Sequence, residues 1–131
     1  MKTVWHYWLP VFAYMSGITY LSSLSSPEEQ IPLLALPLHD KILHAIEYAI
    51  LGTLCFRAFQ KAAGVTGARH AVSLAMLTAT LFGVADEYHQ SFVPLRQADS
   101  LDLLADFVGA ALGIFIWQRI RGSSQERAGA T

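Results

Sequence analysis

Four long apolar stretches constrain this chain more than any other feature of its sequence. They cover residues 4–24, 38–59, 71–93 and 101–117. A transmembrane helix needs roughly 20 apolar residues, because it rises about 1.5 Å per residue across a hydrocarbon layer of about 30 Å. Backbone amides find no water in lipid, so apolar runs of this length are expected to be helical. The sequence therefore predicts an all-α fold, an integral membrane bundle of four transmembrane helices.

The composition agrees with a membrane protein and excludes other classes. Hydrophobic residues make up 53% of the 131 residues and charged residues only 15%, whereas a soluble domain carries about 25% charged residues. The formal net charge of −1 provides no bulk attraction to nucleic acid, so no nucleic-acid partner is expected. Cys55 is the only cysteine, which excludes an intrachain disulfide.

The basic residues predict the orientation of the bundle. With four spans, both termini and the connection over residues 60–70 lie on one side of the membrane, and basic loops mark the cytoplasmic side. We therefore predict cytoplasmic termini, a single domain over residues 1–121 and a flexible cytoplasmic tail over residues 122–131. The basic residues on the predicted cytoplasmic side are Lys2, Arg57, Lys61, Arg69, Arg119, Arg121 and Arg127, and only Lys41 and Arg96 lie on the other side.

The first apolar stretch has an alternative interpretation as a cleaved signal peptide. Lys2 precedes it, and a small-residue segment over residues 22–26 follows it. Against this interpretation, the apolar region exceeds the usual length of about 7–15 residues, and no Ala-x-Ala site ends it. We expect the first stretch to be retained as a helix.

Polar and ionisable side chains interrupt the later stretches. A charge at the bilayer centre costs at least about 2.5 kcal/mol, so such groups usually face a bundle interior and have a role. Here they recur at helical spacing and form one face of each predicted helix. They are Lys41, His44, Glu47 and Tyr48 on the second stretch, Asp86, Glu87 and Gln90 on the third, and Asp102 and Asp106 on the fourth, with Arg96 just before it.

Three of these carboxyl groups are predicted to lie at the same depth. Glu47, Glu87 and Asp106 are six or seven residues inward from the predicted outer boundary, or about 9–10 Å. This coincidence predicts one shared polar pocket that opens outward. The structural alternative is an internal ion-pair network in which Lys41 and Arg96 hold the acids.

Charge counting favours a functional interpretation of this cluster. Seven acids cannot all ionise around two fixed cations in a low-dielectric site, so some carboxyls stay protonated, a cation binds, or His44 and His89 become charged. The spacing of His44 and Glu47 is also that of carboxylate–histidine metal sites in bundles, but a di-metal bundle needs a second such pair. We therefore assign no metal ligand and leave the cofactor unknown, with a divalent cation as the alternative. The seven acids are Asp40, Glu47, Asp86, Glu87, Asp99, Asp102 and Asp106.

Gly109 and Gly113 lie four residues apart on the face that carries Asp102 and Asp106. Small residues at this spacing allow close helix contact in membranes. Because the acids on that face point toward the predicted pocket, we expect the two glycines to pack this helix within the monomer rather than in a dimer.

The order and spacing of these polar residues resemble the VanZ-like family, small multi-span bacterial membrane proteins named for a teicoplanin resistance determinant. Asp106 stands where the family pattern usually has Asn. The resemblance implies a bacterial plasma membrane location and a link to the cell envelope and antibiotic resistance, without an established reaction. It covers residues 38–113 and rests on Asp40, Lys41, His44, Glu47, Tyr48, Asp86, Glu87, Gln90, Phe92, Arg96, Asp102 and Gly109.

Two functions fit these residues. The first is an intramembrane enzyme that acts on an envelope lipid or lipid-linked glycan precursor by acid–base chemistry. Glu87 would be its general base or acid, with His44 as the proton partner of Glu87, Gln90 as a hydrogen-bond donor and Asp102 orienting Arg96. The second is a non-catalytic protein that binds such a lipid or a glycopeptide target and alters its exposure. A third function, proton or ion movement, lacks the inverted repeats of most transporters. The predicted catalytic residues are Glu87, His44, Glu47 and Gln90, and the predicted substrate-binding residues are Lys41, Arg96, Asp86, Asp102, Asp106 and Tyr48.

Overall fold

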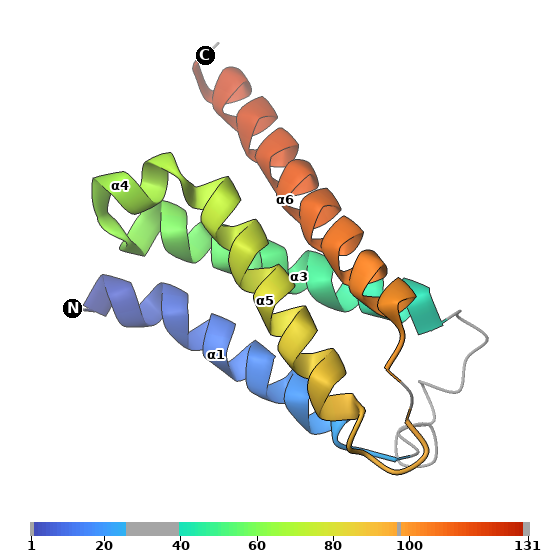
Figure 1. The fold of residues 1–131 in the computed structure, drawn as a ribbon. Coiled ribbons are helices and arrows are strands. Elements are labelled where there is room, and N and C mark those ends of the chain that lie inside the picture. The colour runs from blue at the N-terminus through green and yellow to red at the C-terminus, as the bar shows by residue number, and fades with distance from the viewer. Residues whose placement is uncertain (1, 26–39, 97, 130–131) are drawn as a thin grey trace.

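A computed structural model describes residues 2–25, 40–96 and 98–129 of the chain. Every regular element in these ranges is a helix (Figure 1). The helices are α1 (Lys2–Ser22), α3 (Asp40–Ala62), α4 (Gly64–Arg69), α5 (Ala71–Gln90) and α6 (Ser100–Gly129). The predicted all-helical fold is therefore confirmed, and each of the four apolar stretches overlaps one long helix.

Two of these helices meet the length and apolarity required to cross a membrane. Among the described residues they are Asp40–Ala62 and Ser100–Ser123. Helices α1 and α5 have similar lengths of 21 and 20 residues, but α1 contains His6 and Pro10, and α5 ends in polar residues. The number of spans and the position of the termini stay predictions.

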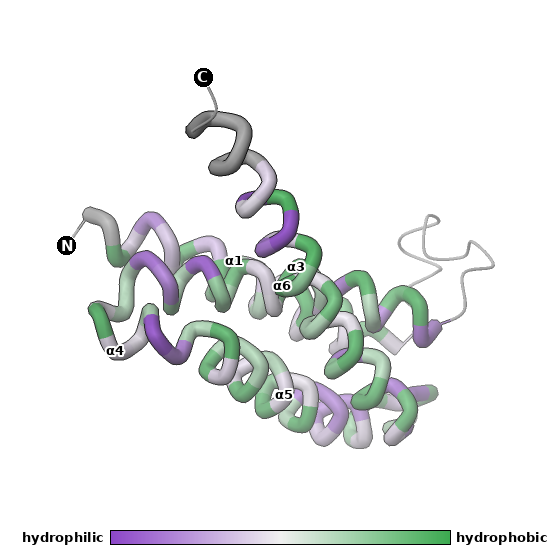
Figure 2. The backbone as a smooth tube through the Cα atoms, turned by 90° about the horizontal axis from the view of Figure 1, so that it is seen from above, coloured by the Kyte–Doolittle hydropathy of each residue, from purple (hydrophilic) through white to green (hydrophobic). Residues whose placement is uncertain are grey.

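The four long helices show the side-chain distribution that is typical of helical membrane proteins. One face of α5 is buried and consists of small residues at four-residue spacing, namely Ala71, Ala75, Ala79 and Gly83. Large apolar side chains are exposed on all four helices, as Phe12, Ile46, Leu81 and Phe115 illustrate. Exposed apolar surface of this extent marks a protein or membrane contact. Figure 2 shows the hydrophobic residues along the middle of the helices and hydrophilic residues nearer their ends.

Helix α3 lies at the centre of the bundle and contacts each of the other helices. Its closest neighbour is α6, because the two backbones touch. A Cβ built on Gly109 would overlap the carbonyl oxygen of Ala45, and one built on Gly113 would overlap that of Ala49. The expectation that these glycines pack the helix within the monomer is confirmed.

The 60–70 connection and the end of the chain both contain helical residues. The 60–70 connection contains the short helix α4, which begins at Gly64 with a φ of +70°. Helix α6 continues through Gly122 to Gly129, and the flexibility of the tail stays a prediction. One glycine costs a helix only about 1 kcal/mol, and the Gln, Glu, Arg and Ala residues that follow are good helix formers.

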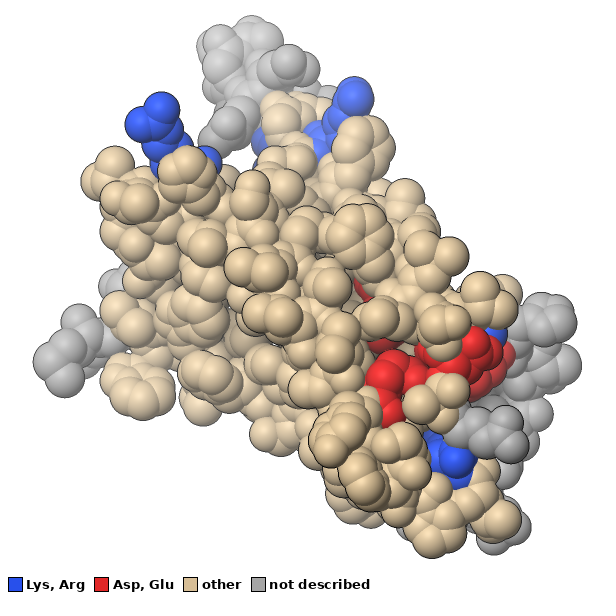
Figure 3. All heavy atoms as spheres, in the orientation of Figure 1, with Lys and Arg blue, Asp and Glu red and all other residues tan. Residues whose placement is uncertain are grey.

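Charged residues gather at opposite ends of the bundle. Acidic side chains reach the surface at one end, and Lys and Arg side chains project from the other (Figure 3). The acidic end contains the start of α3, the end of α5 and the start of α6, whereas the basic end contains both termini and α4 (Figure 1).

Candidate functional site

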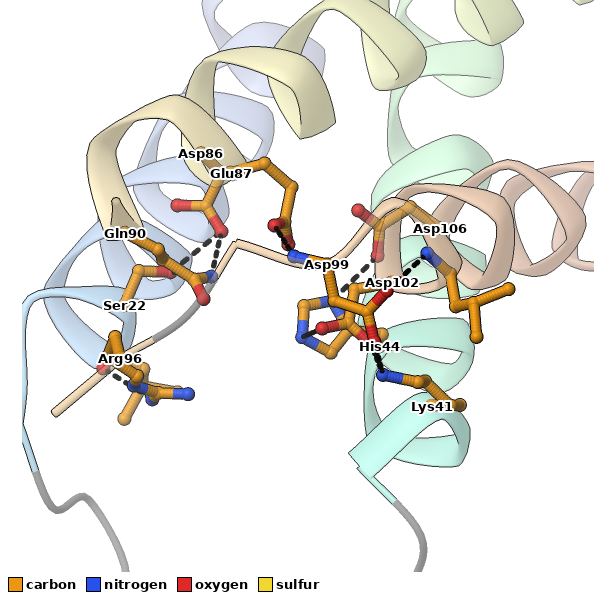
Figure 4. A network of polar contacts seen from close by, with 12 residues as sticks. Ser22, Lys41, His44, Asp86, Glu87, Gln90, Arg96, Asp99, Asp102 and Asp106 are labelled. Atoms are coloured by element: carbon orange, nitrogen blue, oxygen red, sulfur yellow. Dashed lines mark hydrogen bonds and ion pairs between the residues drawn. The ribbon is translucent and has the colours of Figure 1, made fainter. Parts of the chain in front are cut away.

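The polar residues at the acidic end form one network that joins four helices (Figure 4). Its side chains come from the C-terminal ends of α1 and α5, the N-terminal ends of α3 and α6, and the segment between α5 and α6. Most of them are buried, including Asp86 (5% exposed), Glu87 (8%) and Asp106 (1%). Buried charge of this density is costly and is usually retained for a role.

One half of the network holds α3 against α6. The Lys41 ammonium lies 2.6 Å from Asp99 Oδ2 and 2.6 Å from Asp102 Oδ1. One turn further along α3, His44 Nδ1 lies 2.9 Å from Asp106 Oδ1, and Nε2 lies 3.9 Å from Asp102 Oδ2. The carboxylates of α6 are thus paired with the two cationic or titratable groups at the start of α3.

The other half of the network joins α1 to α5. Ser22 Oγ donates to Asp86 Oδ2 at 2.7 Å. Gln90 Nε2 donates to the same oxygen at 3.0 Å, and it lies 3.4 Å from Ser22 Oγ. Three buried side chains therefore close a small polar triangle between the two helix ends.

Glu87 connects the two halves. Its Oε2 accepts the backbone N–H of Asp99 at 2.9 Å, while Asp99 Oδ1 accepts the N–H of Leu101 at 2.9 Å. Asp99 thereby caps the N-terminus of α6. The end of α5 is therefore tied to the start of α6 through one residue.

Arg96 is positioned by a strained turn. Leu95 has a φ of 67°, which a residue with a Cβ rarely adopts and which persists only where surrounding contacts hold it. Arg96 Nε donates to the carbonyl oxygen of Leu24 at 3.2 Å, and Nη2 to that of Leu21 at 3.5 Å. Within the described ranges no carboxylate pairs with Arg96, so its charge is balanced only by the carbonyl end of α1.

A pocket of about 420 Å³ opens beside this network. Arg96 and Gln90 line it together with Leu95 and the paired groups Lys41, Asp99 and Asp102. Four buried oxygens have no hydrogen-bond partner among the described residues, and one of them, Asp102 Oδ1, forms an ion pair with Lys41. The other three are Tyr48 Oη, Asp86 Oδ1 and Glu87 Oε1. An unpaired buried polar group costs about 1–3 kcal/mol, so each is suited to bind a further polar group.

Comparison with known proteins shows the family to which this chain belongs. The sequence pattern of VanZ/LLP1 matches residues 2–121. This chain belongs to the VanZ/LLP1 family. It is also 28% identical over 86 residues to an uncharacterized protein of Schizosaccharomyces pombe, a match that covers 65% of this chain and 50% of that protein. The chain thus spans about half the length of the curated relative it matches, and no solved structure matches it significantly.

The geometry of this VanZ/LLP1 protein revises the predicted pairings. Asp102 pairs with Lys41 and does not orient Arg96. The Lys41 ammonium lies next to Asp102, whereas Arg96 is held by carbonyl oxygens at the end of α1. His44 contacts Asp106 and lies near Asp102 rather than bonding Glu87. Gln90 bonds Asp86, whereas Glu87 turns toward Asp99. The catalytic and binding roles of these residues stay predictions.

Two predicted site residues take part in no side-chain hydrogen bond or ion pair among the described residues. Glu47 is half-buried on α3, and no described group donates a hydrogen bond to it. Tyr48 is 1% exposed and packs beside Phe82, with ring centroids 6.3 Å apart. A Cβ built on Gly83 would lie 3.0 Å from Asp106 Oδ2 and 3.3 Å from Tyr48 Cε1. The glycine therefore lets α5 approach both side chains.

Sequence reasoning missed Ser22 and the carbonyl oxygens of Leu21 and Leu24. Ser22 lies in the small-residue segment over residues 22–26, and nothing in the sequence distinguishes it from Ser23 or Ser25. Backbone carbonyls that bind Arg96 carry no signal in the sequence, because every residue has one.

One group of side chains has the geometry of a metal site in the described part of the VanZ/LLP1 chain. Ligand atoms of Asp40, His44 and Asp102 lie within 4.8 Å of one another. Glu47, which shares the predicted metal spacing with His44, is not in this group. The Lys41 ammonium already pairs with Asp102 at 2.6 Å and would compete with any cation, so we assign no metal here.

Asp99 provides a testable pH dependence outside the helices. The Lys41 ammonium and the N–H of Leu101 hold the pKa of Asp99 below its usual range. A lowered pKa contributes stability above the unfolded-state pKa of about 3.9, and this contribution is lost as the pH falls through the folded-state value. Asn caps a helix as well as Asp does, but it carries no charge.

We therefore expect Asp99→Asn to lower the thermal unfolding midpoint in detergent at pH 7 and to match the wild type at a pH below the folded-state pKa of Asp99. Asp99→Ala should remain less stable than Asp99→Asn at both pH values, because it also removes the cap. A difference between wild type and Asp99→Asn that does not change with pH would show that the Lys41 pair contributes nothing.

Proposed function

We propose that this chain is a four-span protein of the bacterial plasma membrane, with cytoplasmic termini and the polar network on the outer side. The exposed apolar side chains on α1 and α5, and lengths of 21 and 20 residues, support two further spans of about 30 Å each. The basic residues at the end that contains both termini support the orientation.

At the outer end, the protein binds an envelope lipid or lipid-linked glycan precursor through an anionic group such as phosphate. The observation that carries this proposal is Arg96, a guanidinium without a carboxylate partner in the described structure, on the wall of a pocket of about 420 Å³. Arg has five donors, of which two bond carbonyl oxygens here. The remaining donors suit bidentate recognition of phosphate.

The protein then acts on the bound lipid by acid–base chemistry, with Glu87 as the proton-transfer group. One oxygen of Glu87 is fixed by the N–H of Asp99, whereas Oε1 is unpaired. A carboxylate that is anchored through one oxygen presents the other in a defined direction. Gln90 lines the pocket together with Arg96 and donates to Asp86, which also has one unpaired oxygen.

A non-catalytic role in binding is the second candidate, and the position of His44 favours it. An acid–base relay needs its two members in contact, but His44 is bonded to Asp106 instead of Glu87. In this role the same pocket would hold an envelope lipid or glycopeptide target and alter its exposure. Antibiotic resistance would then follow from binding alone.

Variants of Glu87 and Arg96 distinguish these roles. Cells that express the chain, or lack it, would be compared by mass spectrometry of total envelope lipids and of lipid that copurifies with the protein. For an enzyme, we expect Glu87→Gln to reduce a covalently changed lipid species about 100-fold or more, since general acid–base catalysis contributes roughly 10²–10⁴, while copurified lipid remains.

Arg96→Ala should remove copurified lipid in either role. Arg69→Ala is the matched control, because Arg69 is exposed on α4 at the opposite end. A changed lipid species that depends on Glu87 establishes the enzyme, and lipid binding that depends on Arg96 without any changed species establishes the binder. If Arg96→Ala and Glu87→Gln both behave as wild type, the proposed site is wrong.

A further inference from the structure

A second pocket lies at the opposite end of the bundle from the polar network. It has a volume of about 280 Å³ and lies between α1, α3 and α6. Figure 3 shows that Lys and Arg side chains gather at this end. Its lining combines three cations with aromatic and amide groups, including Arg57, Lys61, Arg121, Tyr7, Trp117 and Gln118.

Aromatic rings fix the two arginines in this pocket. The guanidinium of Arg57 lies 5.0 Å from the ring centroid of Trp117 and 5.8 Å from that of Tyr7. The guanidinium of Arg121 lies 5.0 Å from the Trp117 ring. Cation–π contacts of this kind hold a guanidinium in a defined orientation while leaving its N–H donors unused. Two like charges are therefore held against one indole.

No acidic group balances this charge in the described structure. None of the lining residues is Asp or Glu, and every described ion pair lies at the other end of the bundle. Like charges held close together repel unless an anion lies between them. The pocket is thus preorganised for a negatively charged ligand.

The location of the pocket indicates what kind of anion reaches it. Arg57 lies in the last two turns of α3, and Arg121 lies near the end of Ser100–Ser123, the membrane-spanning part of α6. Both groups therefore lie where these spans meet water. Basic pockets between transmembrane helices bind phospholipid head groups, and a planar guanidinium matches phosphate oxygens in pairs.

We propose that this pocket binds a phosphate group, as carried by an anionic phospholipid or by a soluble phosphate. This site goes beyond the proposed function, because it lies at the opposite end and shares no residue with the outer pocket. It would tie α1, α3 and α6 together through one bound anion at the membrane surface.

Native mass spectrometry of the delipidated full chain tests the proposal. The protein in detergent would be titrated with dioctanoyl phosphatidylglycerol, zwitterionic dioctanoyl phosphatidylcholine and inorganic phosphate. Each basic residue near a membrane surface contributes about 1 kcal/mol, or roughly fivefold in affinity. We expect Arg121→Gln to weaken binding of phosphatidylglycerol about fivefold, and Arg57→Gln with Arg121→Gln about 25-fold.

Arg69→Gln with Arg119→Gln is the matched control. It removes the same charge, but Arg69 and Arg119 do not line this pocket, and Arg119 lies over Phe115. Arg121→Gln changes an exposed residue, so the test does not depend on whether Arg57→Gln folds.

If the pocket variants lose phosphatidylglycerol binding and the control variant does not, the ligand is a lipid head group. If the pocket variants lose inorganic phosphate binding and the control variant does not, a soluble phosphate is the source. Equal weakening by the control variant, or wild-type binding of both probes by the pocket variants, overturns the proposal. These outcomes are independent of Glu87 and Arg96, so they leave the proposed function at the outer end unaffected.

Discussion

Gly113→Leu is expected to separate α6 from α3 and to cost more than about 3 kcal/mol of unfolding free energy. Inserting side-chain atoms into a packed interior usually costs about 1–3 kcal/mol, because neighbouring side chains move aside. Here the obstacle is backbone, since even a Cβ at Gly113 would overlap the carbonyl group of Ala49. The measurements are the yield of monodisperse protein in detergent and its thermal unfolding midpoint.

Gly122→Leu provides the control on the same helix. Nothing lies within 4 Å of a Cβ built on Gly122, so this variant should unfold near the wild-type midpoint or slightly above it, because leucine is the better helix former. Gly109→Leu should lower the unfolding midpoint as Gly113→Leu does, since a Cβ at Gly109 would overlap the backbone of Ala45. Wild-type stability of Gly113→Leu would show that the α3–α6 contact is not close-packed.

The same contact shows how far the sequence predicts the fold. Helix positions follow from hydropathy and length, which are local properties of the chain, and Gly109 and Gly113 are recognisable because only glycine lacks a Cβ. The partner residues Ala45 and Ala49 give no comparable signal, because alanine also lines lipid-facing and buried surfaces elsewhere in the bundle. The sequence therefore predicts that α6 packs closely within the monomer, but not the helix it contacts.

The contacts of the candidate site can likewise be predicted only in part from the sequence. Helical spacing predicts that Lys41 and His44 share one face of a helix and that Asp102 and Asp106 share one face of another. It does not predict which carboxylate each cation meets, because a rotation or shift of one helix changes every pair. Arg96 illustrates the limit most clearly, since its partners are carbonyl oxygens of Leu21 and Leu24, which no side-chain pattern encodes.

Asp106→Leu is expected to destabilise the protein by about 3–5 kcal/mol, the cost of removing one partner of a buried charged pair. Asp106 is 1% exposed, His44 is 7% exposed, and His44 Nδ1 lies 2.9 Å from Asp106 Oδ1. The substitution leaves the imidazole buried without its acceptor. Thermal unfolding in detergent measures the loss, with Asp106→Asn as the conservative variant.

Asp106→Asn keeps an acceptor oxygen of the same shape, so it should cost much less than Asp106→Leu. The double variant His44→Phe with Asp106→Leu removes both polar partners together, and replacement of both by apolar groups is often nearly neutral. We therefore expect the double variant to be more stable than Asp106→Leu alone, with a coupling free energy of about 2–3 kcal/mol. Additive losses in this cycle would show that the His44–Asp106 contact does not hold α3 to α6.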